Sequence, residues 1–279
     1  MPRKTLSIIG VGLLGGSVAL AARQRRVVDW VVGFDRPQVL ERAVARDILD
    51  EAVTDLSLAV TDADLVVFCT PVNVIVDQVR EAVPYCRPGA VLTDVGSTKS
   101  SIVQALGGWL EDRVAFVGSH PLAGSEKSGP EYARADLFEN RLVVVTPGPH
   151  SPEEAVLRVM GFWHALGASV KPMDAQEHDR ALGTTSHLPH AVASVLAASL
   201  PEEWRSLTAT GFRDTTRIAA GNAELWRAIF ESNREAVLEA LERFGHLFES
   251  FRAALANKDS QKLLELLERG KQVRDSLGK

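Results

Sequence analysis

A histidine, His120, stands in the glycine- and serine-rich segment GSHPLAGSEKSG, which follows a short apolar run. Histidine titrates near neutral pH and can accept a proton from a hydroxyl group. A histidine followed by proline in a polar loop is poorly placed for a core, so we expect His120 to act as a catalytic base. The simpler alternative is a buried histidine whose hydrogen bonds are satisfied within the core.

The segment DVGSTKS places Gly96, Ser97 and Thr98 at the end of an expected strand, just before an expected helix. In an open parallel sheet, the strand ends near the switch point line the ligand crevice. We therefore expect Ser97 to face a ligand bound in that crevice. Alternatively, Ser97 or Thr98 only caps the helix that begins near Lys99.

A glycine-rich turn connects the first apolar run, LSIIG, to a helical segment. The turn GVGLLG comprises Gly10, Val11, Gly12, Leu13, Leu14 and Gly15. Gly10 permits a tight turn, Gly12 lets the backbone approach a pyrophosphate, and Gly15 lets the helix pack closely on its strand. This strand–turn–helix context predicts a dinucleotide site, the alternative being an ordinary tight turn of a flavodoxin-like domain.

The second apolar run, VVGFD, ends at Asp35, about twenty residues beyond the last glycine of the turn. A carboxylate there can accept a hydrogen bond from a ribose 2′-hydroxyl and repels a 2′-phosphate, which favours NAD. Arg36 leaves the use of NADP open, because a guanidinium can reach a 2′-phosphate. Thr70 and Pro71, which follow the run LVVFC, complete the expected cofactor-binding set.

The elements that must position these residues alternate along residues 6–173. The β-rich runs are LSIIG, WVVGFD, DLVVFCT, AVLTDV, VAFVG, LVVVTP and ASVKPM. Helices are expected at 14–25, 38–46, 72–83, 99–110 and 152–166. This alternation predicts a doubly wound, mostly parallel α/β domain, a Rossmann-type dinucleotide-binding domain over residues 1–173.

The strand signal ends at Met173, and the rest of the chain has helical periodicity, including residues 222–256 and 259–277. We therefore expect an all-helical domain over residues 174–279. Its apolar stripes exceed what the outer surface of a monomer usually carries, which predicts a homodimer built on these helices. The alternative is that the stripes pack on one another within one subunit.

Composition excludes several classes of function. The chain of 279 residues is 46% hydrophobic and 24% charged, as in globular proteins, and its net charge of −5 argues against a nucleic-acid partner. Its two cysteines, Cys69 and Cys86, cannot form a disulfide framework, which indicates a cytoplasmic protein. A core-like strand begins close to Met1 and no apolar run reaches membrane-spanning length, so we expect no signal peptide and no membrane association.

Three histidines of the helical half, His178, His187 and His190, invite comparison with a metal site. Pro189 lies between the closest pair, and the cysteines belong to the other domain. Proton transfer to His120 needs no Lewis acid, so we expect no metal.

Five segments together resemble the prephenate/arogenate dehydrogenase family of tyrosine biosynthesis: GVGLLGGS, DVGSTKS, GSHPLAGSEKSG, EHDRALGTTSHLPHAVA and GFRDTTRIAAGNAELWRAIF. The resemblance spans almost the whole chain. It implies an NAD-dependent oxidative decarboxylation, in which ring C4 gives hydride to the nicotinamide and the ring carboxylate leaves as CO2. Prephenate would yield 4-hydroxyphenylpyruvate, and arogenate would yield tyrosine.

The resemblance also implies roles for residues. His120 would accept the proton of the ring 4-hydroxyl, Ser97 would orient His120 and that hydroxyl, and Arg217 would bind a substrate carboxylate, for which a planar guanidinium is suited. His190, Arg213 and Trp226 match further substrate-site positions, although each could instead serve packing or solvation. A second cation, Arg213, favours prephenate over arogenate.

Two acidic residues, Glu126 and Asp179, align with acidic positions of the family, where they could pair with arginine and gate the cleft. We do not expect them to be catalytic, because acidic residues are most often simply solvated.

Two other functions compete with this interpretation. A β-hydroxyacid dehydrogenase or imine reductase also joins a dinucleotide domain to a helical dimer domain, but it would leave His120 without a task. An NAD-sensing regulator without catalysis would explain neither His120 nor Arg217.

Overall fold

The computed structural model describes residues 3–107, 113–124 and 127–278. The chain forms two compact units, residues 1–233 and residues 234–279. The first unit contains the sheet and every predicted site residue. The second is a pair of helices, α11 (Arg234–Ala256) and α12 (Ser260–Ser276).

The centre of the first unit is a single twisted sheet with the strand order β3-β2-β1-β4-β5-β6-β7-β8. Its strands are β1 (Thr5–Ile9), β2 (Trp30–Phe34), β3 (Glu51–Val53), β4 (Leu65–Phe68), β5 (Ala90–Asp94), β6 (Val114–Pro121), β7 (Leu142–Thr146) and β8 (Ser169–Pro172). All neighbours are parallel except β6 and β7, which are antiparallel. The order reverses between β1 and β4, which is where ligands bind in such sheets.

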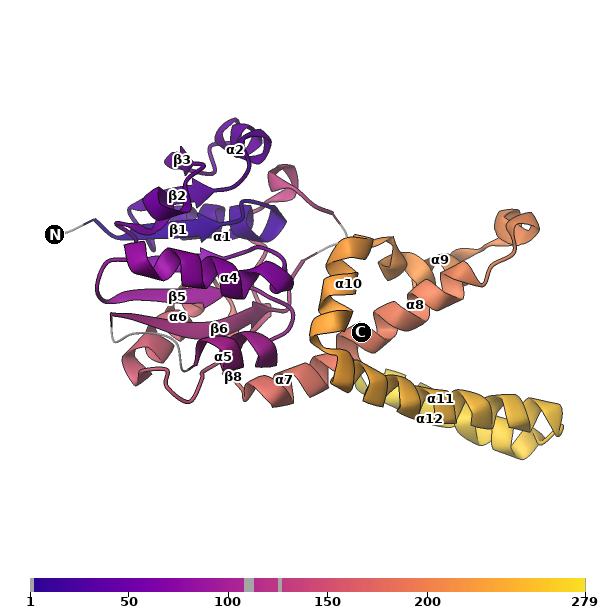
Figure 1. The fold of residues 1–279 in the computed structure, drawn as a ribbon. Helices are drawn as coiled ribbons and strands as arrows, with labels where there is room; N and C mark the ends of the chain where they lie inside the picture. Colours follow the sequence, from indigo (N-terminus) through magenta and orange to yellow (C-terminus); the bar gives the residue numbers. More distant parts are fainter. Residues whose placement is uncertain (1–2, 108–112, 125–126, 279) are drawn as a thin grey trace. The chain divides into compact units, whose positions relative to one another are not determined.

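Helices cover both faces of this sheet (Figure 1). They are α1 (Leu13–Gln24), α2 (Pro37–Val44), α3 (Leu56–Val60), α4 (Val72–Ala82), α5 (Ser100–Leu106) and α6 (Glu153–Ala165). Side chains of α1, α2 and α6 bury one face, and side chains of α3, α4 and α5 bury the other. With both faces covered, strands such as β1 and β4 are buried along their whole length, as is usual in parallel sheets.

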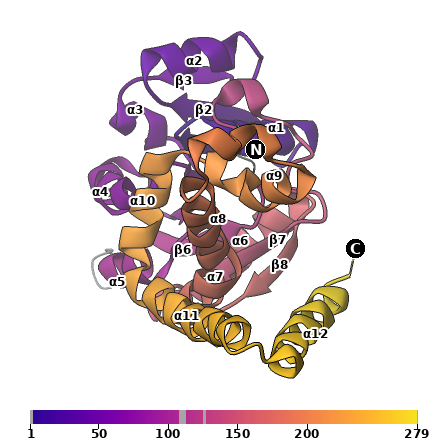
Figure 2. The same cartoon turned by 90° about the vertical axis from the view of Figure 1, so that its right-hand side faces the viewer.

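The helices that follow the sheet begin with α7 (Ala175–Leu182), which continues through a π-helical turn, η3 (Gly183–His187), into α8 (Leu188–Ala198). After η4 (Glu202–Leu207) come α9 (Thr210–Thr216), η5 (Arg217–Ala220) and α10 (Ala223–Ser232). Figure 2 shows this group turned toward the viewer. Contacts of Ala228 and Ile229 with Val72 dock α10 on α4, which fixes this helical group on the dinucleotide-binding sheet.

The predicted fold class is confirmed: a Rossmann-type sheet is followed by helices alone. Short β3 and α3 were not predicted, because neither has enough residues to show a period. The helix expected over residues 222–256 is two helices, interrupted at Asn233, whose side chain bonds to other parts of the first unit. The helix expected over residues 99–110 ends at Leu106, and residues 108–110 lie outside the described part of the chain.

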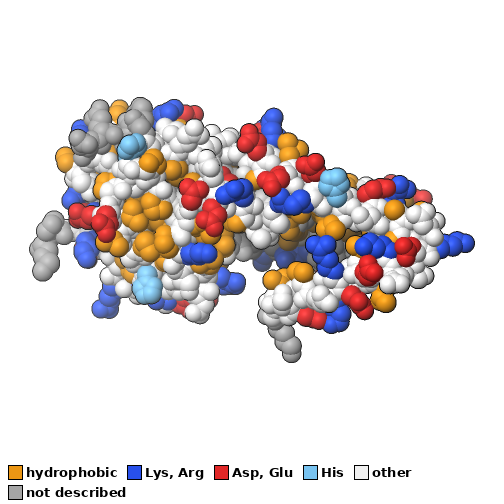
Figure 3. Space-filling view, turned by 90° about the horizontal axis from the view of Figure 1, so that it is seen from below, with side chains coloured by type: hydrophobic (Ala, Val, Ile, Leu, Met, Phe, Trp, Pro, Cys, Tyr) orange, Lys and Arg blue, Asp and Glu red, His pale blue; other side chains and the backbone are white. Residues whose placement is uncertain are grey.

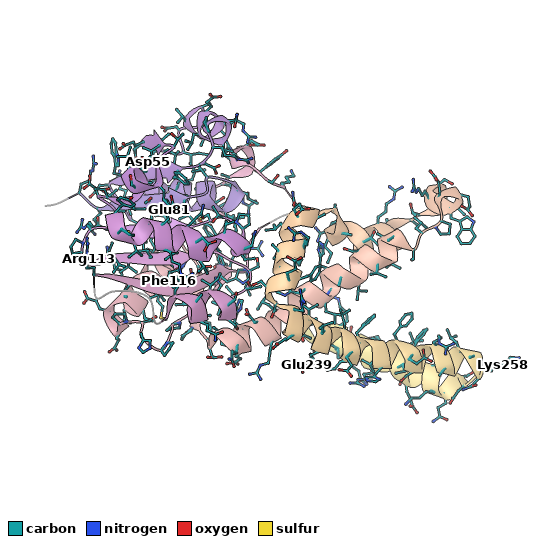
Figure 4. The ribbon with its side chains drawn as sticks, viewed as in Figure 1. Asp55, Glu81, Arg113, Phe116, Glu239 and Lys258 are labelled. Carbon is teal, nitrogen blue, oxygen red and sulfur yellow. The ribbon has the colours of Figure 1, made fainter. Side chains whose placement is uncertain are left out.

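The sheet has two edges at which its strands begin or end. No predicted site residue lies at the edge where β5 and β6 begin. Figure 4 labels Arg113 just before β6, Phe116 on β6 and Glu81 near the end of α4, on the side away from α7 and α10. A cavity lined in part by Arg113, Phe116 and His150 lies at this edge. It is therefore at the other end of the strands from His120.

No helix in the described part of the chain combines the length and apolar character needed to cross a membrane. On the face drawn in Figure 3, Lys and Arg side chains are interspersed with Asp and Glu side chains.

Candidate active site

The glycine turn between β1 and α1 leaves room for a ligand beside Gly12. Gly10 has a φ of +96°, and a Cβ built there would lie 2.9 Å from the Thr70 side chain and 3.0 Å from the Cys69 backbone. A Cβ on Gly12, in contrast, would meet no atom within 4 Å. Gly12 is also the N-cap residue of α1 and has no side chain to cap it, so the first N–H groups of the helix are available to an anion. The turn therefore fits a dinucleotide pyrophosphate.

The other predicted cofactor residues surround this turn. Asp35 accepts hydrogen bonds from the N–H groups of Val11 at 2.8 Å and Arg36 at 2.7 Å, while the Arg36 side chain is 83% exposed. The Thr70 hydroxyl group donates a hydrogen bond to Gln78 Oε1 at 2.5 Å, and Pro71 directly precedes α4. These positions follow the carboxyl ends of β1, β2 and β4, so the fold brings the predicted set together at one edge of the sheet.

His120 does not lie in a loop, contrary to the prediction. It belongs to β6, where it is paired with Val144 of the antiparallel strand β7 and is only 8% exposed. The apolar pattern ends at Gly118, but pairing with β7 extends the strand through Pro121. The histidine is therefore buried at the carboxyl end of β6, the edge that also carries the glycine turn.

A chain of hydrogen bonds runs from His120 into α7. His120 Nδ1 lies 2.9 Å from His178 Nε2, and His178 Nδ1 lies 2.8 Å from Asp179 Oδ1. His178 is fully buried and Asp179 is 5% exposed. Sequence reasoning considered His178 only as a metal ligand and did not foresee this contact.

Asp179 is held where α5 begins. Its two carboxylate oxygens accept hydrogen bonds from the N–H groups of Lys99 and Ser100, both at 2.8 Å. Burial acts to raise the pKa of Asp179, but the hydrogen bonds from His178 and these N–H groups outweigh burial, and the net pKa is lowered. Asp179 is thus ionised, and its carboxylate oxygens can act only as hydrogen-bond acceptors.

This arrangement fixes the tautomer of His120. Because Asp179 only accepts, His178 Nδ1 must donate, and in a neutral His178 ring Nε2 is then the acceptor. His120 Nδ1 must therefore donate, which leaves its Nε2 as an acceptor with no hydrogen-bond partner among the described residues. Burial is the largest cause that holds the pKa of His120 well below its usual value, and the charge of nearby Lys99 acts in the same direction. A neutral imidazole with a free Nε2 is the form that a general base requires.

Ser97 lies half-buried in the turn between β5 and α5. Among the hydrogen bonds of the described residues, none joins Ser97 to His120; the His120 partner is His178. The orienting role of Ser97 thus stays a prediction.

His190 and Trp226 form a stacked pair, with ring centroids 3.5 Å apart and planes inclined by 12°. Gly221 makes this close stack possible, because a Cβ there would lie 2.7 Å from the Trp226 ring nitrogen. His190 is 4% exposed, and its Nδ1 has no hydrogen-bond partner among the described residues. Arg213 and Arg217 lie exposed on the α9 and η5 segment, which packs against α8, the helix of His190.

Asn233 connects this stack to the His120 chain. Its amide nitrogen lies 2.8 Å from the carbonyl oxygen of Asp179 and 3.0 Å from Nδ1 of His187, whose ring meets Trp226 edge-on. The structure therefore brings His120, His190 and Trp226 into one connected network. Asn233 was missed because a single polar residue between two helical segments carries no sequence signal of its own.

Among the described residues, no group of three His, Cys, Asp or Glu side chains is arranged to hold a metal ion. Glu126 lies outside the described residues.

Comparison with known proteins identifies both halves of the chain. Residues 18–171 match the family described as prephenate dehydrogenase, nucleotide-binding domain, and residues 174–269 match prephenate dehydrogenase, dimerization domain. The cyclohexadienyl dehydrogenase of Zymomonas mobilis is 34% identical, over 98% of this chain and 96% of its own length.

Solved structures give the same result. A crystal structure of prephenate dehydrogenase from A. aeolicus, in complex with hydroxyphenyl propionate and NAD+, is similar with a TM-score of 0.91, 31% identity and 99% coverage of both chains. The arogenate dehydrogenase of Synechocystis gives a TM-score of 0.81 at 30% identity, covering 98% of this chain and 99% of its own. The β-hydroxyacid alternative is not favoured: a 3-hydroxyisobutyrate dehydrogenase from Mycobacterium tuberculosis is 16% identical, with a TM-score of 0.54, and shares the fold alone.

Proposed function

Because this chain belongs to the prephenate dehydrogenase family, we propose that it catalyses the NAD-dependent oxidative decarboxylation of prephenate, arogenate or both. The observation that carries this proposal is the contact of His120 with His178, which leaves Nε2 of a neutral imidazole as a proton acceptor at the edge of the sheet that carries the glycine turn. Relatives with these names supply the substrate class.

His120 Nε2 takes the proton of the ring 4-hydroxyl group. Bound NAD supplies the acceptor for the hydride that leaves C4. The ring carboxylate then departs as CO2, its bonding electrons enter the ring, and the resulting phenolate takes a proton back to give an aromatic phenol. His178 and Asp179 act as positioning residues, because they hold His120 Nδ1 as a donor throughout and so keep the reactive lone pair on Nε2.

Substrate binding is assigned to the helical segments that follow the sheet. Arg217 binds a carboxylate of the substrate, since a guanidinium offers two parallel donors to it. The unpartnered Nδ1 of buried His190 supports a second polar contact, and Trp226 holds that ring in place by stacking. Arg213 adds positive charge and favours prephenate, which has one more net negative charge than arogenate. Loss of Arg217 should mainly raise KM.

The cofactor assignment is supported by the turn itself. The open space beside Gly12 and the uncapped start of α1 fit the pyrophosphate, and Asp35, 17% exposed, stands where a ribose hydroxyl group would donate to it. The exposed Arg36 side chain could reach the 2′-phosphate of NADP, and the rate comparison below tests whether NADP is also used.

A homodimer through the C-terminal helices is part of the proposal. The second match is to a dimerization domain, and the helices of the second unit expose many large apolar side chains. These are Leu238, Leu241, Phe244, Leu247, Phe248 and Leu255 on α11, and Leu264, Leu267 and Val273 on α12.

The proposed functional boundary falls near residue 173, between the two matched regions. The biosynthetic role of the relatives and the two free cysteines, Cys69 and Cys86, support a cytoplasmic location.

Initial rates of NADH or NADPH formation with prephenate and arogenate test the proposal. Turnover with NAD and at least one of the two substrates is expected, with higher kcat/KM for prephenate. Failure to oxidise either substrate, by folded protein that binds NAD, would overturn it.

A further inference from the structure

Two opposite charges, Asp94 and Lys99, are completely buried beside the strand that carries His120. The Lys99 ammonium contacts Asp94 Oδ2 and donates a hydrogen bond to the carbonyl oxygen of Ser119 at 3.0 Å. Asp94 Oδ1 accepts from the N–H of Ser119 at 3.2 Å. The pair thus holds both backbone polar groups of the residue directly before His120.

Lys99 also reaches His120 by a second route. Its backbone N–H donates to Asp179 Oδ1, and Asp179 holds His178, which in turn holds His120. The ammonium therefore fixes the backbone before His120, while the N–H fixes the partner of its ring.

Such a pair is not explained by stability alone. Taking two charges out of water costs free energy, and well-packed apolar side chains of the same volume are often as stable or more stable. Buried charges beside a titratable group do, however, shift the pKa of that group, and groups with shifted pKa values cluster at functional sites.

The titratable and charged groups near His120 are His178 and Asp179 of α7, His187 of η3, and the Asp94–Lys99 pair between β5 and α5. Burial is the first cause of the low pKa of His120, and the positive charge of Lys99 adds to it. Burial is the largest cause that lowers the pKa of Lys99, and the contact with Asp94 opposes this shift and so favours the charged ammonium.

We propose that Lys99 is a positioning residue of this reaction: its buried ammonium, held by Asp94, fixes the segment that carries His120 and keeps the His120 ring neutral. This rests on the proposed role of His120 as the base. It assigns a task to the lysine of DVGSTKS, which sequence reasoning had placed only at the start of a helix.

The test follows the His120 ring directly. Protein labelled with ¹³C-histidine is titrated by NMR, and the His120 signal is assigned by its loss in His120→Asn. The variants are Lys99→Met and the charge-neutral pair Asp94→Asn/Lys99→Met, which keeps the proposal testable if the single variant fails to fold. Lys171→Met, which removes the same charge from an exposed position on β8, is the matched control.

In Lys99→Met the titration of His120 should move up by about one pH unit, because a nearby positive charge is lost, and the acidic limb of kcat/KM should move with it. The double variant also loses the Asp94 carboxylate, so its shift should have the same direction but be smaller. Lys171→Met should leave both unchanged. The proposal would be overturned if the titration of His120 were unchanged in a folded Lys99 variant and activity were lowered equally at all pH values. That result would mean that the Lys99 side chain serves only to pack the core. The NMR titration needs no turnover, so an inactive wild type would count against the proposed function alone.

Discussion

Nε2 of His178 lies 2.9 Å from Nδ1 of His120, and this contact decides which nitrogen of His120 is left to react. The ionised carboxylate of Asp179 determines the direction of the chain, because it makes His178 Nδ1 a donor. Asp179, which is two hydrogen bonds away from His120, therefore determines which nitrogen of the His120 ring carries the proton.

Asp179→Asn should break this order. An amide can present N–H to His178 and reverse its tautomer, so His120 Nε2 would carry a proton and could no longer act as a base. We expect kcat to fall on the order of a hundredfold or more, as for other histidines that lose their orienting carboxylate, with KM changed by less than about threefold. Steady-state kinetics would measure this, with Asp62→Asn, an exposed position, as the control. Wild-type kcat in the folded variant would refute the ordering role.

His187 predicts a pH dependence of stability. Burial is the first cause that lowers its pKa from 6.5 to about 4, so the unfolded chain binds more protons than the folded chain between these values. Stability contributed by His187 is therefore complete above pH 6.5 and is lost as the pH falls toward about 4. The loss amounts to at most about 1.4 kcal/mol per pH unit for this one group.

Denaturant unfolding of the wild type and His187→Gln across this pH range would measure the effect. Glutamine keeps an acceptor for the Asn233 amide but does not titrate. The variant should show a shallower decline of the unfolding free energy with falling pH. Equal slopes in the two proteins would contradict the prediction.

The two glycines of the turn should respond differently to alanine. Gly12→Ala has open space in the protein, so its unfolding free energy should change by less than about 0.5 kcal/mol, while the Kd for NAD should rise about tenfold or more. Gly10→Ala would force a side chain into a φ of +96° and against Cys69, which should destabilise the fold by about 1–3 kcal/mol. Calorimetric titration and thermal unfolding distinguish them. Unimpaired NAD binding by Gly12→Ala would place the pyrophosphate elsewhere.

The C-terminal helices should hold two subunits together. Leu241→Glu and Phe248→Glu place charges on the apolar face of α11, and each should convert a dimer into monomers. Sedimentation velocity would measure the mass, with Leu58→Glu on α3, a position 64% exposed, as the control. Dimers that persist in both α11 variants would rule out this interface.

Much of the fold was predictable because its signals are local. The glycine turn, Asp35 and the alternating apolar runs each depend on a few neighbouring residues, and the sheet places them as parallel topology requires. His120 is selected as the acid–base group of its segment by residue type, a role that stays a prediction, but the expected loop setting was wrong. Only pairing with β7, a contact across the chain, shows that the histidine lies in a strand.

The supporting residues could not be predicted from local pattern. His178 lies 58 residues from His120, and Asn233 lies 54 residues from Asp179, so the contacts exist only in the folded chain. The sequence places Lys99 only near the start of an expected helix. Its burial follows from packing between β5 and β6, which no periodicity of the segment reveals.

The most direct test of the central claim is His120→Asn. Asparagine is polar and similar in reach but cannot accept a proton at neutral pH, so it removes the base while leaving the pocket nearly unchanged. Turnover of prephenate should fall by about 10²–10⁴-fold, with the affinities for NAD and prephenate changed by less than about threefold. Near-normal turnover by this variant would contradict the account, because no proton acceptor would then be needed at His120.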